Sequence, residues 1–148
     1  LNSLEAEDTM VAVIRFVDGA LGTIEATTAA RPQDFEATLS IVGEKGLVQI
    51  GGIALNRVDI WSFIDSEPND ETIPEQYSQN VPTGYGVGHG PLLTDLVARL
   101  KRGETAAPIA GSEGVKSAEL VHALYRSIET KGWVELASSP RSDRLGRG

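Results

Sequence analysis

Two histidines, His89 and His122, are the only imidazoles of the chain, and imidazole is the side chain best suited to acid–base chemistry near neutral pH. They stand 33 residues apart, with neither the Gly-x-Ser-x-Gly turn of serine hydrolases nor the His-Glu-x-x-His motif of zinc proteases around them. His122 flanks the apolar stripe of an expected helix, so we interpret it as structural. Two isolated histidines predict no metal site.

The Gly-rich segment at residues 84–91, with the sequence GYGVGHGP, carries more chemical possibilities. It opens an expected helix, where free N–H groups favour an anion, and its glycines allow a ligand or partner to approach the backbone closely. It does not match G-x-G-x-x-G and no strand is expected just before it, which disfavours a dinucleotide site. Tyr85 and His89 are candidates for facing a cleft; the alternative for His89 is a role in capping the helix.

Arg31 is the third candidate. It follows a Thr-rich expected strand, stands beside Pro32 in a turn and could face a substrate anion. The remaining acids of interest fall at strand positions, where solvation or cross-strand pairing is the ordinary role: Asp8, Glu25, Glu36 and Asp59. No paired carboxylates for acid–base catalysis are evident.

The composition narrows the class of protein. The chain has 148 residues, 41% hydrophobic and 23% charged, and a formal net charge of −8, which makes nucleic acid and anionic membranes poor partners. It has no cysteine, which removes disulfides and thiolate sites and fits a reducing compartment; we expect a cytoplasmic location. No membrane span or signal pattern is apparent. Because the chain does not begin with Met, we expect a fragment or a processed product.

Strand-forming residues dominate the first half and helix-forming residues the second. We expect strands at residues 8–17, 20–29, 34–42, 47–50 and 53–64, a long loop at 65–88, helices at 91–103 and 112–132, a short strand at 133–136 and a flexible tail at 138–148. Asp18-Gly19 predicts a hairpin turn. Strands followed by helices predict an α+β fold, an open and mostly antiparallel sheet with two main helices packed on one face.

The first expected strand is apolar on both sides. One face carries Met10, Ala12, Ile14 and Phe16, and the other carries Val11, Val13 and Val17. A strand that is apolar on both faces is normally covered on both. We therefore expect a second covering layer from another subunit or a missing domain.

Three blocks together resemble the C-terminal domain of the Gfo/Idh/MocA family of NAD(P)-dependent oxidoreductases: DTMVAVIRFVDGALGTIEATTAA at residues 8–30, LSIVGEKGLVQIGG at 39–52 and GSEGVKSAELVHALYRSIETKGWVEL at 111–136. The first is similar to the family pattern F-x-x-G-x-x-G-x-I. With the helix GHGPLLTDLVARLKRG, the resemblance reaches nearly to Leu136. GGIALNRVDIWSF and YGVGHGP are similar to the branch that oxidises UDP-N-acetyl-glucosaminuronic acid at the 3-position.

The resemblance implies a two-domain enzyme. A Rossmann domain, absent from this chain, binds the NAD(P), and residues 1–137 form the domain that shapes the substrate pocket and makes homodimers or tetramers through its sheet. The family's catalytic Lys in Glu-Lys-Pro has no match, because Glu44-Lys45 is followed by Gly46 and occupies an expected turn. The family's catalytic His motif at the start of the second domain is missing as well. We expect this chain to bind no cofactor and to be inactive in hydride transfer by itself.

The same resemblance makes His89, Tyr85 and Arg31 the candidate contacts to a sugar or sugar-nucleotide substrate, and suggests that Asn56 and Trp61 stabilise the sheet or a subunit contact. Two alternatives stay open from the residues alone. One is a free-standing, non-enzymatic oligomerisation or small-ligand-binding module. The other is a dimeric α+β barrel enzyme that uses the sheet face as its pocket, which is disfavoured because no acid–base set lines either face.

Overall fold

The computed structural model describes residues 7–33 and 35–143. They divide into two compact units. The first unit contains residues 7–29 and 106–143, and the second contains the described residues between 30 and 105. Both ends of the described chain therefore belong to the first unit.

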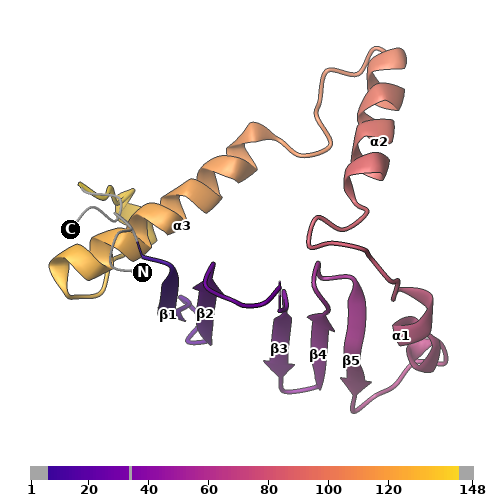
Figure 1. The fold of residues 1–148 in the computed structure, drawn as a ribbon, viewed down its shortest axis with the longest axis horizontal. Coiled ribbons are helices and arrows are strands. Elements are labelled where there is room, and N and C mark those ends of the chain that lie inside the picture. The colour runs from indigo at the N-terminus through magenta and orange to yellow at the C-terminus, as the bar shows by residue number, and fades with distance from the viewer. Residues whose placement is uncertain (1–6, 34, 144–148) are drawn as a thin grey trace. The chain divides into compact units, whose positions relative to one another are not determined.

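The strands of the first unit form a hairpin (Figure 1). β1 (Thr9–Arg15) pairs antiparallel with β2 (Leu21–Thr27), and Ala12 lies opposite Ile24. The turn confirms the Asp18-Gly19 prediction: Gly19 has a φ of +94°, in the region that favours glycine, and the Ala20 N–H donates to the Asp18 carboxylate at 3.1 Å.

The two faces of β1 differ in exposure. Met10, Ala12 and Ile14 are half-buried, whereas Val11 and Val13 are 69% and 57% exposed. Both faces are apolar, as the sequence pattern predicts, and the Val11 face is open in the structure. It is therefore a surface that another protein layer would stabilise.

The long helix of the first unit is α3 (Gly111–Thr130), and it ends at Lys131, which adopts a left-handed conformation with a φ of +55°. The strand expected at residues 133–136 is wrong. The Arg15 guanidinium instead lies over the Trp133 ring, with its carbon 5.2 Å from the ring centroid. The chain then enters the short helix η2 (Leu136–Ser138). The local reason is that no described strand pairs with this segment.

The segment after η2 lies against α3. The Ser142 N–H donates to Nδ1 of His122 at 3.2 Å, and the Ser142 hydroxyl donates to Glu129 at 2.5 Å. Arg126 pairs with Asp143 at 2.7 Å. His122 thus has a structural partner, as its interpretation from sequence requires. Part of the tail expected to be flexible is held by these contacts, and residues 144–148 lie outside the described residues.

The second unit contains a three-stranded antiparallel sheet in the order β3 (Leu39–Gly43), β4 (Gly46–Gly51), β5 (Arg57–Phe63) (Figure 1). β3 begins later than expected from the alternation at 34–42. Its partner β4 ends at Gly51. One further hydrogen bond continues the pairing, from the Ala37 N–H to the Gly52 carbonyl at 2.7 Å, and Gly52 then turns the chain away at a φ of +88°. Residue 34 is outside the described residues.

The segment after β5 is more ordered than the long loop expected at 65–88. It contains η1 (Asp70–Thr72) and α1 (Ile73–Gln76), which lie beside β5 (Figure 1). Asp70 accepts hydrogen bonds from the Trp61 indole at 2.8 Å and from the Glu67 N–H at 2.6 Å. We call residues 67–79 the strap. The Asp70 and Ser78 side chains bond to β5, and the Gln79 carbonyl bonds to Asn56, the residue just before β5.

The α+β class and the antiparallel pairing are confirmed. Where the sequence predicts one sheet, the described residues form two: β1–β2 in the first unit and β3–β4–β5 in the second. The segment that joins β2 to β3 is hydrogen-bonded at both of its ends, because the Thr28 N–H donates to the Asp8 carbonyl at 2.8 Å and the Ala37 N–H donates to the Gly52 carbonyl at 2.7 Å. In neither unit does the long helix, α2 (His89–Lys101) or α3, pack broadly on that unit's strands. No helix in the described parts of the chain combines the length and apolar character needed to cross a membrane.

Candidate functional site

A cavity of about 490 Å³ lies in the second unit where three segments meet: the β4–β5 turn, the residues at and after the end of the strap, and the start of α2. We call it the corner pocket. Its polar side chains are Asn56, Gln79, Tyr85 and His89. Apolar residues form the rest of the wall with two glycines: Ala54, Leu55, Val81, Val87, Pro91 and Leu92, with Gly86 and Gly88.

Asn56 joins two walls of this pocket. Its amide nitrogen donates to the Gln79 carbonyl at 2.6 Å, and its amide oxygen accepts from the Ala54 N–H at 3.1 Å. The Gln79 N–H in turn donates to the Asn56 carbonyl at 3.0 Å, and the next strand residue, Val58, donates its N–H to the Ser78 hydroxyl at 3.0 Å. The end of the strap is therefore held on the β4–β5 turn by a closed set of hydrogen bonds.

The backbone of the β4–β5 turn is unusual. Leu55 has a φ of +52°, a conformation that costs a non-glycine residue of its kind on the order of 1 kcal/mol. Gly52 has a φ of +88°, and a Cβ added there would overlap the Asn56 side-chain oxygen. Gly86, at a φ of +64°, approaches the same turn so closely that an added Cβ would lie 3.3 Å from that of Ala54. The sequence here is shaped to bring backbone segments together.

Tyr85 and His89 both line the corner pocket, so the structure brings together two of the three candidates. Tyr85 is 83% exposed, and His89 is the first residue of α2. No side-chain hydrogen bond caps this helix, so the geometry gives no support to a capping role for His89. Within the described residues, the Tyr85 hydroxyl, the His89 ring and the Gln79 amide form no hydrogen bond with the protein and are open to a ligand.

Arg31 is not part of the corner pocket. Its guanidinium donates to the neighbouring Ala30 carbonyl at 2.6 Å. No sequence motif marks Gln79, and the resemblance suggests for Asn56 a role in stabilising the sheet or a subunit contact. The one sequence signal for Asn56 is the Gly51-Gly52 pair four residues before it, because two consecutive glycines predict a tight turn in which a nearby side chain packs against the backbone.

The residues at the start of α2 do not fit a dinucleotide. β5 ends at Phe63, and the chain passes through the strap before it reaches the Gly-rich segment at 84–91, so the strand–turn–helix unit of that motif is missing. Elsewhere in the described ranges, no three His, Asp or Glu side chains gather in a way that could hold a metal ion.

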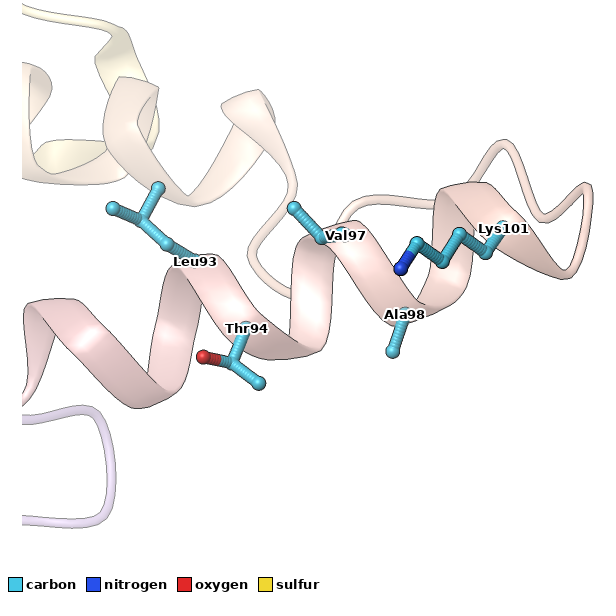
Figure 2. A pocket seen from close by; sticks show the side chains of 5 residues that line it. All are labelled: Leu93, Thr94, Val97, Ala98 and Lys101. Atoms are coloured by element: carbon cyan, nitrogen blue, oxygen red, sulfur yellow. The ribbon is translucent and has the colours of Figure 1, made fainter.

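A second hollow of about 400 Å³ lies along α2 (Figure 2). All of the side chains that line it come from this one helix: Leu93, Thr94, Val97, Ala98 and Lys101. One helix surface cannot enclose a ligand, and the sole charged group is Lys101. We therefore take the corner pocket, whose walls come from three segments, as the candidate site.

Comparison with known proteins establishes the family. Residues 2–136 match the family model described as "Oxidoreductase family, C-terminal alpha/beta domain". The chain belongs to the Gfo/Idh/MocA oxidoreductase family, of which it forms the C-terminal α/β domain.

Two solved structures place the chain near one branch of that family. It is 40% identical to the WlbA dehydrogenase from Bordetella pertussis in complex with NADH and UDP-GlcNAcA, with a TM-score of 0.73 over 86% of this chain and 36% of that one. It is 33% identical to the WlbA dehydrogenase from Chromobacterium violaceum, also in complex with NADH and UDP-GlcNAcA, with a TM-score of 0.71 over 88% of this chain and 35% of that one. The chain thus spans just over a third of these relatives. No curated protein matches it.

Proposed function

We propose that the chain is the substrate-binding and oligomerisation domain of an NAD(P)-dependent sugar-nucleotide dehydrogenase. The observation that supports this most is the 40% identity with a WlbA dehydrogenase whose structure contains NADH and UDP-GlcNAcA. In this proposal the missing part of the protein binds the NAD(P) and supplies the catalytic lysine and histidine, and the intact protein works in the cytoplasm.

The corner pocket is the part of the chain that we assign to substrate. Tyr85 and His89 line one cavity with Gln79, and their side-chain polar groups form no hydrogen bond with the described residues. We assign them binding and orientation of the substrate. We assign hydride transfer to the part of the protein beyond this chain, because Lys45, the nearest sequence match to the family lysine, lies in the β3–β4 turn and outside the pocket.

The open face of β1 supports the oligomerisation role. Val11, Val13 and, on β2, Leu21 lie on one side of the hairpin and are mostly exposed. Burying such a surface against a second copy stabilises the assembly in proportion to the apolar area removed from water.

Substitutions in the intact enzyme test the assignment. With UDP-GlcNAcA as substrate, His89→Ala and Tyr85→Ala are expected to raise KM or lower kcat/KM by about 10-fold or more, because each removes a hydrogen-bonding or stacking group worth about 1–3 kcal/mol. Asn80→Ala is the matched control: it lies between two lining residues, Gln79 and Val81, and does not line the pocket. Unchanged kinetics in both variants would remove the corner pocket from the substrate site.

The rival function is a non-enzymatic oligomerisation or ligand-binding module. It predicts that the intact protein shows no NAD(P)-dependent oxidation of any nucleotide sugar. The same assay therefore separates the two.

A further inference from the structure

The corner pocket is lined without a single lysine, arginine, aspartate or glutamate, although such residues make up 23% of the chain. Its unengaged polar groups are an amide, a phenol and an imidazole, on Gln79, Tyr85 and His89. An anion in this pocket would meet hydrogen-bond donors but no lysine or arginine side chain to neutralise its charge. The lining is therefore suited to an uncharged ligand group.

We propose that the corner pocket binds an uncharged polar ring of the substrate, a nucleobase or a pyranose, and that the anionic groups of the substrate lie outside it. This inference rests on the proposed function, because it states which part of a nucleotide sugar the pocket takes. The two rings share the chemistry that matters here: a flat or apolar face and an edge of hydrogen-bonding groups.

The side chains present match both features of such a ring. The exposed aromatic ring of Tyr85 offers a surface on which a flat or apolar ring face stacks. Leu55, Val81 and Leu92 add apolar wall. The Gln79 amide can both donate and accept, as the edge of a base or the hydroxyls of a sugar require.

Asn56 positions this wall and does not read the ligand. Its amide oxygen is bonded to Ala54 and its amide nitrogen to the Gln79 carbonyl. Since the Gln79 N–H is also bonded, to the Asn56 carbonyl, the backbone of Gln79 is fixed on both sides and its side chain is presented from a rigid frame. A frame fixed before binding lowers the entropy lost when ligand binds.

The competing occupant is a phosphate at the start of α2. A helix N-terminus attracts anions, but here Pro91 removes one of the free N–H groups, and no lysine or arginine lines the pocket beside it. The experiment below is designed to distinguish an anion from an uncharged ring.

A charge scan in the intact protein tests the proposal. Gln79→Lys and Gln79→Glu place opposite charges in the pocket wall, and Asn80→Lys and Asn80→Glu place the same charges on the next residue, outside the lining. Isothermal titration with UDP-GlcNAcA gives a Kd for each variant. At Asn80, the Kd of the Glu variant divided by the Kd of the Lys variant measures how strongly a charge outside the pocket attracts or repels the substrate's anionic groups at a distance.

If the pocket holds an uncharged ring, the Glu-to-Lys ratio of Kd at Gln79 should lie within about threefold of the same ratio at Asn80. Both Gln79 variants should bind UDP-GlcNAcA more weakly than wild type, because both lose the amide. A phosphate or carboxylate in the pocket would make Lys tighten and Glu weaken binding, with a ratio about 10-fold or more above the control at low salt. A Gln79 ratio more than threefold above the Asn80 ratio overturns the proposal.

Small probes identify the ring and keep the test independent of the proposed function. Uridine, methyl N-acetylglucosaminide and inorganic pyrophosphate are titrated separately into the intact protein and its Tyr85→Ala variant. Binding of one uncharged probe that falls about 5-fold or more in the variant supports the proposal and names the ring. Tyr85-dependent binding of pyrophosphate, or no binding of either uncharged probe, overturns it. Should UDP-GlcNAcA fail to bind at all, the proposed function fails, and these probes still decide what the pocket takes.

Discussion

The pairing of Gly52 with Asn56 leads to a prediction of strong coupling between two substitutions. A Cβ at Gly52 would overlap the Asn56 side-chain oxygen. Gly52→Ala must therefore displace the Asn56 amide, and with it the bonds to Ala54 and Gln79. In effect, the glycine variant already contains the loss that Asn56→Ala would cause.

The magnitudes follow from this geometry. Asn56→Ala removes two hydrogen bonds and should destabilise the protein by about 1–3 kcal/mol. Gly52→Ala should cost the same amount plus about 1–2 kcal/mol for an alanine at a φ of +88°. In the double variant the bonds are lost only once, so Asn56→Ala should cost close to zero when Gly52 is already alanine. The coupling energy is then about 1–3 kcal/mol.

Urea unfolding of the intact protein and its three variants gives the four free energies of the cycle. Hydrogen exchange at the Ala54 and Gln79 amides reports the same corner locally, because both N–H groups bond to Asn56. Gly90→Ala is the control: an added Cβ meets nothing within 4 Å and the position is helical, so it should be neutral or slightly stabilising. Costs that add to within about 0.5 kcal/mol would refute the proposed steric link between these residues.

Two further predictions concern the first unit. Val13→Lys on the open face of β1 should raise the dissociation constant of a homodimer about 30-fold, since each copy loses about 1 kcal/mol of apolar burial. Glu44→Lys in the β3–β4 turn is the control. An unchanged sedimentation profile for Val13→Lys would exclude this face from the interface. The hydrogen bond from the Tyr125 hydroxyl to Glu7 raises the pKa of Tyr125 above its ordinary value near 10. The bond therefore stabilises the folded protein fully below pH 10, and this stabilisation is lost as the pH rises through the raised pKa. Tyr125→Phe should therefore be less stable than wild type at pH 8 and equal to it at sufficiently alkaline pH, as urea unfolding at both pH values would show; a constant difference would contradict the assignment.

Much of the local structure could be predicted because it is set by local chemistry. Asp18-Gly19 fixes the first hairpin, and Lys131-Gly132 marks the end of α3. The strand expected at 34–42 is confirmed from Leu39 onward, whereas its start and the whole strand expected at 133–136 are wrong. A strand requires a partner, and the sequence of one segment does not show where its partner strand ends. At Gly52 the partner turns away, and at Trp133 there is none among the described strands.

The candidate site was partly predictable for the same reason. Tyr85 and His89 belong to one short Gly-rich segment, so their proximity is local and readable. Gln79 and Asn56 are 23 residues apart and meet through the hydrogen bonds of the strap. Arg31, chosen for its charge next to a strand, lines neither hollow described above, and its contact with substrate stays a prediction.

The proposed division of the substrate between the two parts of the protein follows from charge. UDP-GlcNAcA, present in the two related structures, carries a diphosphate and a carboxylate in addition to its rings. This chain has a net charge of −8, and its corner pocket holds no lysine or arginine, so the chain repels those anions overall and the pocket offers them no cationic side chain. If the pocket takes an uncharged ring, cations from elsewhere must hold the anionic groups. We propose that these cations lie in the part of the enzyme beyond this chain, which makes up nearly two thirds of the related proteins. Adding that part should strengthen binding of UDP-GlcNAcA far more than binding of the uncharged ring alone.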